Sequence, residues 1–354
     1  YPVTALGRLI SIGESSPETR SREEVFAFVE QEIMESIPQL GKKGDTNWYG
    51  HFTKSAANAL LAKLYMNAEV FTGTPRWQDA VDAIDNVMDS NYSLDPHWST
   101  PFLVNNESSN ENIFVVPFDA NNATGFNFAQ QNLHEEILFN KYDVEYYGWH
   151  KYSSQESFFN LFSENDARIE QWVVGPQTFI NDAGEEEPIW SWYGNEMFIT
   201  PEITALQSDN TGWDEGAMNI KYEIEVGGLA NMSNDMVVFR LADMMLLKAE
   251  ALMRLNGGSA TEEAVSLVNQ VRERNFENDA DALYTTSTLT LDELIDERGR
   301  ELAYEMHRRE DLIRFGKFND AWWEKSASEE YRKLFPIPAT VLTANPALEQ
   351  NPGY

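Results

Sequence analysis

The chain has 354 residues, of which 42% are hydrophobic and 12% aromatic, so it can bury one large core or two smaller ones. Its 58 acidic side chains against 26 basic ones give a net charge of -32, which argues against nucleic acid and anionic bilayer surfaces as partners. The absence of cysteine excludes disulfides and thiolate nucleophiles or ligands.

Three helices are predicted in the first hundred residues. Residues 23–37 carry apolar side chains at three- and four-residue intervals, which is typical of an amphipathic helix with one buried stripe, and Pro38 ends it. Thr53 is placed to cap a second helix, whose apolar pattern runs over residues 56–70. A third helix is predicted over residues 77–89.

The apolar pattern of the third helix returns later in the chain, which indicates an internal repeat. The two copies are Ala80, Val81, Ile84 and Val87, and Ala264, Val265, Val268 and Val271. Helix pairs of this kind look like tetratricopeptide units, which need a neighbour to bury their apolar faces. The predicted fold class is therefore mainly α: a scaffold of helix pairs interrupted by a loop-rich insertion with a few short strands. Its predicted parts are a first scaffold segment (1–98), a ligand-binding insertion (99–235), and the resumed scaffold with a C-terminal strap (236–354).

The insertion is rich in Asn, Asp and Gly turn signals, and short strands are predicted at its borders, over residues 112–118 and 236–239. Long loops on a rigid scaffold commonly carry binding residues. One acidic segment, residues 209–215, has oxygen ligands suited to calcium but lacks the spacing of an EF-hand loop, so a solvated loop is the favoured interpretation.

Aromatic residues concentrate in this insertion. A sugar ring presents a face of C–H groups that stacks on an indole or phenol ring, while its hydroxyls bond to polar side chains. The alternative is that these rings are ordinary core packing. The candidate ligand-binding residues are Trp149, Tyr146, Tyr147, Trp192 and Tyr193, with Trp149 first; the same stretch also holds Tyr142, Tyr152, Trp190 and Trp213.

The last sixty residues predict a charged helix followed by a proline-rich tail. The helical stretch is residues 291–318, whose Glu and Arg side chains at three- and four-residue spacing are interpreted as intrahelical ion pairs with a structural role. Four prolines in the tail restrict the main chain and remove amide donors, so residues 334–354 are predicted to lie extended as a strap over a folded surface.

Three blocks in this order resemble the SusD/RagB family, the outer-membrane nutrient-binding lipoproteins that partner TonB-dependent transporters. The blocks are RLADMMLLKAEA at residues 240–251, ERGRELAYEMHRREDLIRFG at residues 297–316, and LFPIPAT at residues 334–340. The resemblance covers roughly residues 15–354 and implies one SusD-like domain that lacks its native N-terminal part. It also implies a surface-exposed lipoprotein of a Gram-negative outer membrane, whose lipid anchor lies outside these residues.

The function implied is non-catalytic binding of an oligosaccharide or polysaccharide for delivery to a SusC-like TonB-dependent transporter. The family's aromatic platform draws partly on the segment that here holds Tyr146, Tyr147 and Trp149. No cofactor and no metal are expected, because the five histidines show no ligand spacing and no phosphate-binding loop or nucleophile turn is present. Hydrolysis by paired carboxylates has little support, since 58 acidic residues bring such pairs together almost anywhere.

Two other functions remain open from the sequence. The chain could be a tetratricopeptide-type scaffold for protein contacts, or it could capture a non-glycan nutrient such as a peptide. Solvent exposure of Trp149, Trp192 and Tyr193 separates the glycan platform from the pure scaffold, because full burial of all three would remove the platform.

Overall fold

The computed structural model describes residues 19–144, 146–205, 214–277 and 279–354. Helices dominate, and the strands are short, which confirms the predicted mainly α fold class. The helices are α1 (Arg22–Ser36), α2 (Lys54–Met66), α3 (Ala68–Thr72), α4 (Trp77–Met88), α5 (Phe128–Asn132), α6 (Glu135–Tyr142), α7 (Glu156–Phe159), α8 (Leu241–Leu255), α9 (Glu262–Glu273), α10 (Leu291–Glu301), α11 (Arg308–Arg314) and α12 (Ala339–Ala344). The strands are β1 (Asn112–Val116), β2 (Trp172–Val173), β3 (Gly175–Pro176), β4 (Thr178–Ile180), β5 (Glu186–Pro188), β6 (Phe198–Ile199), β7 (Met218–Asn219) and β8 (Met236–Arg240).

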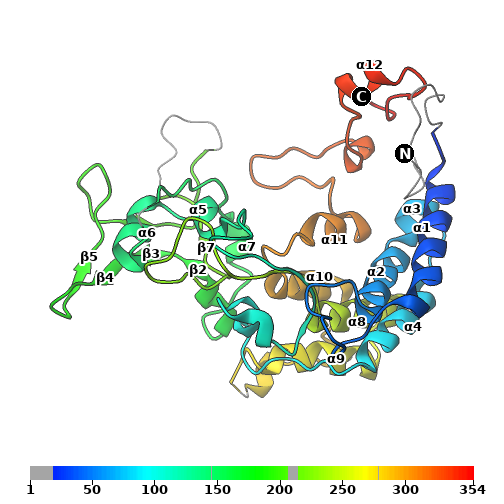
Figure 1. Cartoon of the computed structure of the whole chain (residues 1–354), viewed down its shortest axis with the longest axis horizontal. Coiled ribbons are helices and arrows are strands. Elements are labelled where there is room, and N and C mark those ends of the chain that lie inside the picture. Colours follow the sequence, from blue (N-terminus) through cyan, green and yellow to red (C-terminus); the bar gives the residue numbers. More distant parts are fainter. Residues whose placement is uncertain (1–18, 145, 206–213, 278) are drawn as a thin grey trace.

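A helical body forms one end of the molecule, and segments from both sides of the insertion build it (Figure 1). Helix α2 packs on α4, α4 on α8, and α8 on α9, so the two predicted helix pairs lie in one continuous stack. Small residues permit the close packing: Ala56, Ala59 and Ala62 of α2 are fully buried in the same cluster as Ala80 and Ala251. The exact borders at residues 98 and 235 stay a prediction.

The first helices follow the sequence prediction with two differences. Thr53 caps α2 as expected, because its Oγ1 accepts a hydrogen bond from the amide of Ala56 at 3.2 Å. The predicted helix over residues 56–70 is interrupted at Asn67, which separates α2 from α3 and whose side-chain amide donates to the carbonyl of Lys63 at 2.9 Å. In α1 only Phe26 is buried, so the apolar stripe of this helix is more open than predicted.

The predicted helical stretch over residues 291–318 is two helices, α10 and α11. Between them Tyr304 and Met306 have φ angles of 61° and 66°. Those are left-handed conformations that an α-helix cannot continue through. The chain therefore turns between the two helices, and the prediction of one continuous helix is wrong.

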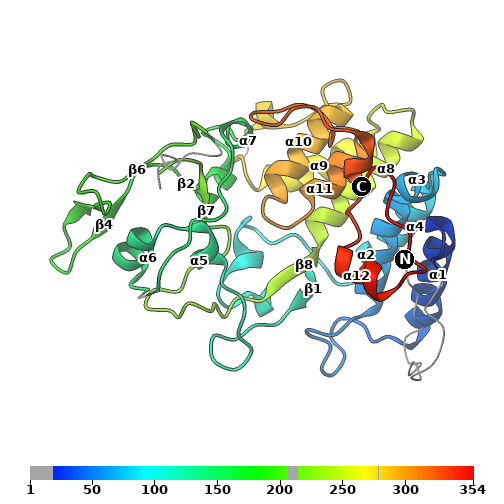
Figure 2. The same cartoon turned by 90° about the horizontal axis from the view of Figure 1, so that it is seen from above.

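Strands β1 and β8 stand where the insertion begins and ends. They pair antiparallel, with Val115 opposite Val237 and Val116 opposite Met236, which confirms the predicted strands and adds their pairing. Figure 2 shows this ribbon between the helical body and the end of the molecule that holds α5, α6 and β2 to β7. Those smaller strands form three further two-stranded pairs, β2 with β7, β3 with β6, and β4 with β5.

Buried ion pairs join the insertion to the helical body. Arg168, in the insertion, donates to the carboxylates of Glu297 at 2.9 Å and Glu301 at 2.8 Å, both in α10. Lys221, also in the insertion, donates to Glu305. All five side chains are buried.

The charged residues of α10 were predicted to pair within their own helix, and this is mostly wrong. Arg300 does pair with Glu297 three residues before it, but Glu297 also accepts from Arg168 and Arg272, and Arg298 pairs with Asp243 and Asp311. The physical reason is burial, because a charge removed from water needs partners from every element that surrounds it. The charged residues of α10 still have the predicted structural role, but their ion pairs connect α10 to other elements.

The C-terminal tail differs from the predicted strap. It contains α12 and closes on itself: the side chain of Gln350 bonds to both main-chain groups of Ile337, and the hydroxyl of Tyr354 donates to the carbonyl of Leu334 at 2.7 Å. Arg309 of α11 holds the start of the tail to the helical body by donating to the carbonyl of Lys333 at 3.0 Å.

An open groove of about 990 Å³ lies between residues 330–335, α11 and the apolar side of α1 and α3. None of the described helices is long and apolar enough to span a bilayer.

Candidate functional site: an exposed aromatic strip on α5 and α6

The candidate site is built on the short helices α5 and α6, which lie far from the α1 end of the molecule (Figures 1 and 2). His134 begins α6, because its Nδ1 accepts a hydrogen bond from the amide of Glu136 at 3.1 Å. Asp143 ends the helix in a left-handed conformation, with φ at 52°. Residues 146–152, here called the aromatic strip, lie beside α5 and the start of α6.

The aromatic strip is fixed through its own main chain to α5 and to Leu133, the residue after that helix. The amides of Trp149, His150 and Lys151 donate to the carbonyls of Gln130, Leu133 and Gln131 at 2.7, 3.3 and 2.8 Å respectively. The side-chain amide of Gln130 donates to the carbonyl of Tyr147 at 2.9 Å. These bonds are made by main-chain groups of the strip. The side chains of the strip are therefore not needed for this attachment.

All five candidate rings are exposed to solvent. The exposed fractions are 42% for Tyr146, 69% for Tyr147, 39% for Trp149, 52% for Trp192 and 75% for Tyr193. Large aromatic side chains are normally buried, so several exposed ones in one region mark an interaction surface. The interpretation of these rings as ordinary core packing is wrong.

Trp192 reaches the same helix from another part of the chain. It lies in the turn between β5 and β6, where the amide of Gly194 bonds to the carbonyl of Ser191 at 2.9 Å. Its ring centroid is 5.4 Å from that of His134. Burial raises the pKa of Glu135 and the neighbouring Glu136 charge adds to this, while a hydrogen bond from Trp192 acts in the opposite direction. The strip and the Trp192 turn therefore meet at the start of α6.

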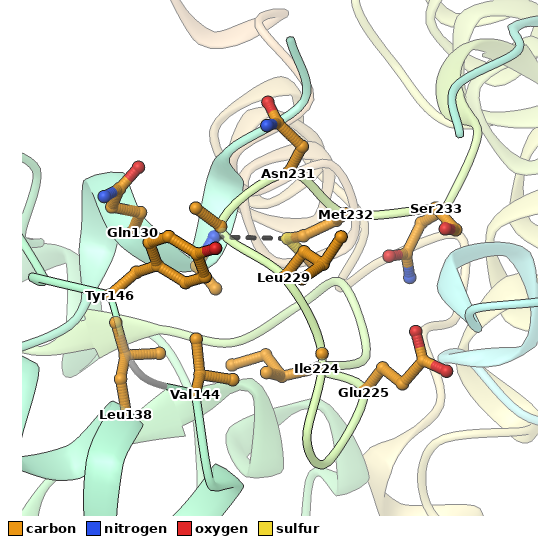
Figure 3. Close-up of a pocket in the computed structure, with 14 residues that line it drawn as sticks. Gln130, Leu138, Val144, Tyr146, Ile224, Glu225, Leu229, Asn231, Met232 and Ser233 are labelled. Carbon is orange, nitrogen blue, oxygen red and sulfur yellow. Dashed lines mark hydrogen bonds between the residues drawn. The ribbon is translucent and has the colours of Figure 1, made fainter. Parts of the chain in front are cut away.

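The rings nevertheless do not share one environment. Tyr147 packs edge-on against Phe139 of α6, with ring centroids 6.3 Å apart. Tyr146 lines a small pocket together with Gln130, Leu229 and Met232 (Figure 3). That pocket has a volume of about 20 Å³, which holds a water molecule but no sugar ring. Tyr146 thus belongs to the edge of the surface rather than to a sugar-sized cavity.

Two histidines lie beneath the surface. Burial lowers the pKa of His150 to about 4, and the neighbouring His134 contributes to the decrease. Burial also lowers the pKa of His134, against the charges of Glu136 and Asp214. Both imidazoles are therefore neutral at pH 7; His134 is buried beneath the strip, and His150 is half-buried within it. In the part of the chain that the structure describes, no group of three or more His, Asp or Glu side chains could hold a metal ion.

Sequence reasoning missed two residues that shape this surface. Gln130 holds the strip, and Lys151 places its ammonium 4.4 Å from the centroid of the Trp149 ring. No sequence motif marks them, and only their nearness to the aromatic residues could have signalled them. Trp213 and most of the acidic segment 209–215 lie outside the described residues.

Sequence comparison finds relatives of this chain in one protein family. A sequence model of the SusD family matches residues 91–354. The starch-binding protein SusD of Bacteroides thetaiotaomicron is 25% identical over an alignment that covers 96% of this chain and 67% of that protein. The SusD-like protein P25 of Formosa agariphila is 38% identical over a shorter stretch, 35% of this chain and 26% of that protein.

Solved structures show the same fold. The surface glycan-binding protein A from Bacteroides thetaiotaomicron has a TM-score of 0.71 at 21% identity, covering 93% of this chain and 70% of that one. The same protein in complex with laminarihexaose gives a TM-score of 0.69, again at 21% identity, covering 93% and 70%. At this level of identity the likeness concerns the fold.

Proposed function

The chain belongs to the SusD family, and from that premise we propose that its aromatic strip and the Trp192 turn bind a glycan without making or breaking bonds. The observation that carries the proposal is the exposure of Trp149, Trp192 and Tyr193, three rings presented from two chain segments around the start of α6. The named activities of two relatives, starch binding and glycan binding, support the same ligand class.

The energetics favour a long ligand. A stacked ring contributes about 1 kcal/mol beyond the area it buries, whereas association costs on the order of 4 to 15 kcal/mol. A short oligosaccharide that meets one or two rings therefore binds weakly. A polysaccharide that contacts both the strip and the turn gains from several rings after it has met the cost of association once.

The buried carboxylates give no support to a hydrolase. The Glu297 carboxylate is buried, which alone would raise its pKa, but the charges of Arg168, Arg300 and Arg272 lower the pKa to about 2. Glu301 and Glu305 are also buried beside cationic side chains that lower their pKa values. A general acid needs the opposite shift and access to substrate. Incubation with polysaccharide is expected to leave the polymer length unchanged.

Replacement of Trp149 tests the proposal directly. We expect Trp149→Ala to weaken polysaccharide binding about fivefold, which corresponds to about 1 kcal/mol for one stacked ring. The measurement is migration in native gels that contain each of a panel of neutral and charged polysaccharides.

Trp322→Ala is the matched control, because Trp322 is similarly exposed at 45% but lies on the loop after α11. Equal loss in the two variants, or no retention of the unaltered protein on any polysaccharide, would count against the proposal. Retention on peptides instead would favour the alternative of a non-glycan nutrient.

We also propose that the chain acts at the surface of a Gram-negative outer membrane, attached by a lipid anchor that precedes these residues, and passes its ligand to a SusC-like TonB-dependent transporter. Family membership supports this. Labelling of intact cells with antibodies tests the location, and co-purification of a TonB-dependent transporter with the tagged protein tests the partner. Absence of surface labelling, or recovery only of soluble partners, would favour a protein-interaction scaffold.

A further inference from the structure

Lys151 stands beside Trp149 at the centre of the aromatic strip. Its ammonium nitrogen lies 4.4 Å from the centroid of the Trp149 ring, and both residues are held by amide hydrogen bonds to α5. Because the two main-chain positions are fixed and the ammonium lies over the Trp149 ring, an anion that approaches the lysine also comes close to the tryptophan. The pair offers one apolar surface and one positive charge to the same ligand.

The ammonium of Lys151 has no hydrogen-bond or ion-pair partner among the residues that the structure describes. No carboxylate forms an ion pair with it and no acceptor takes a hydrogen bond from its ammonium, although the chain carries 58 acidic side chains. Lys325 offers a comparison, because its ammonium lies 5.1 Å from the Trp322 ring centroid but also donates to the carbonyl of Asp320 at 2.7 Å. Lys325 is bound within the protein, whereas the three donors of Lys151 are left to water or to a ligand.

Lys151 is also the only cationic side chain of the strip. The rest of residues 146–152 are aromatic residues, a glycine and His150, which is neutral at pH 7 because its pKa lies near 4. Glu135 and Glu136 carry carboxylates at the start of α6, which the strip approaches closely at Gly148. Within the strip itself, the charge that a bound sugar meets beside Trp149 is that of Lys151.

We propose that the glycan bound at this strip is anionic, and that a carboxylate or sulfate on the sugar accepts hydrogen bonds from Lys151 while the sugar ring stacks on Trp149. A charge-assisted hydrogen bond is about twice as strong as a neutral one, so the lysine selects charged over neutral sugars that share the same C–H face. The inference rests on the proposed function and narrows its ligand class.

The test compares polymers that differ only in charge. Suitable pairs are pectin with a high degree of methyl esterification against de-esterified polygalacturonate, which varies the carboxylate, and laminarin against chemically sulfated laminarin, which varies the sulfate. Binding is measured by native gels and by calorimetry with the unaltered chain. We expect the charged member of at least one pair to bind about threefold to tenfold more tightly, and we expect this preference to decrease as salt rises.

Three variants identify the lysine as the cause. Lys151→Gln should remove the preference, so that the charged and the neutral polymer of a pair bind alike, Lys151→Arg should keep the preference, and Lys325→Gln, the matched Trp-stacked control, should keep it as well. Equal binding of both members of each pair, or an equal effect of Lys151→Gln on both, overturns this inference while the proposed function stands. Failure of every polymer to bind overturns both.

Discussion

At Gly148 the main chain of the aromatic strip passes so close to the start of α6 that no side chain fits. A Cβ atom there would lie 2.2 Å from the carbonyl oxygen of Leu133 and 2.7 Å from the amide nitrogen of Glu135. These are main-chain atoms of a capped helix and cannot move aside cheaply. The glycine is therefore required by close approach, and it sets how near the rings lie to α6.

Gly148→Ala is expected to push the strip away from the helices, to lower the free energy of unfolding by about 1 to 3 kcal/mol and to weaken polysaccharide binding. Urea unfolding and native gels measure the two effects. Gly41→Ala is the control, since a Cβ at Gly41 would meet only Asp45 Oδ2 at 3.4 Å, and we expect a change within about 0.5 kcal/mol. A Gly148→Ala protein that unfolds and binds normally would contradict the close-approach argument.

Part of this residue-scale picture could be predicted from the sequence. The exposure of Trp149, Trp192 and Tyr193 was expected, because clustered rings in polar loops are unlike a core. The contact of Trp192 with His134 could not be predicted, since the fold brings the two residues together and no local sequence pattern encodes their distance. Whether the ammonium of Lys151 has a hydrogen-bond partner likewise depends on residues that are distant in the sequence.

Among the elements, the 3₁₀ turn over residues 167–171 carries the contact between the insertion and α10. Arg168 in this turn is 1% exposed and donates to Asp166, Glu297 and Glu301. Its removal leaves three buried carboxylates short of one cation, and an uncompensated buried charge is strongly unfavourable. This guanidinium is the ionic link between the turn and α10, and the amide of Ala167 adds one main-chain hydrogen bond to the carbonyl of Asn275 at 2.8 Å.

We expect Arg168→Met to reduce the free energy of unfolding by about 3 to 5 kcal/mol, measured by urea unfolding followed by tryptophan fluorescence. Arg20→Met is the control, because Arg20 pairs with Glu24 at 3.6 Å while both side chains are more than half exposed, and such a pair contributes about 1 kcal/mol or less. Comparable small losses in both variants would show that the insertion is held by apolar packing alone.

Helix positions were the most predictable elements, because apolar spacing depends on nearby residues only, as in α1, α2 and α4. The break between α10 and α11 was not predictable, since Tyr304 and Met306 adopt left-handed conformations without being glycine. Nor was the pairing of Glu297 with Arg168, which lies 129 residues away. A charged helix with three- and four-residue spacing has the same local pattern whether it faces water or other elements.

The whole molecule combines an excess of surface carboxylates with a set of buried and half-buried ones that are held by cations. The pKa of Glu310 is lowered to about 2, since His307 and Lys63 outweigh the effect of its burial. Glu297 is lowered to about 2 as well. Both groups have an ordinary pKa of 4.5, so the unfolded chain takes up their protons at a higher pH than the folded chain does.

Stability is therefore expected to be full above about pH 4.5 and to be lost as the pH falls towards 2, where the folded carboxylates finally protonate. Unfolding temperatures measured at pH 7, 4.5 and 3 check this. The excess of surface carboxylates predicts the reverse trend, because their protonation relieves a net charge of -32. A protein that becomes more stable between pH 4.5 and pH 3 would show that surface repulsion outweighs the buried pairs.

The way the aromatic strip is fastened has a consequence for how such a protein changes over generations. All four hydrogen bonds that hold residues 147–151 use main-chain atoms of the strip, so the side chains of Trp149 and Lys151 add no hydrogen bond to this attachment. We expect substitutions at these two positions to leave the fold intact and to change the ligand that the surface accepts. Natural variants can therefore diverge there without loss of stability, and a laboratory library randomised at the two positions should express as well as the parent.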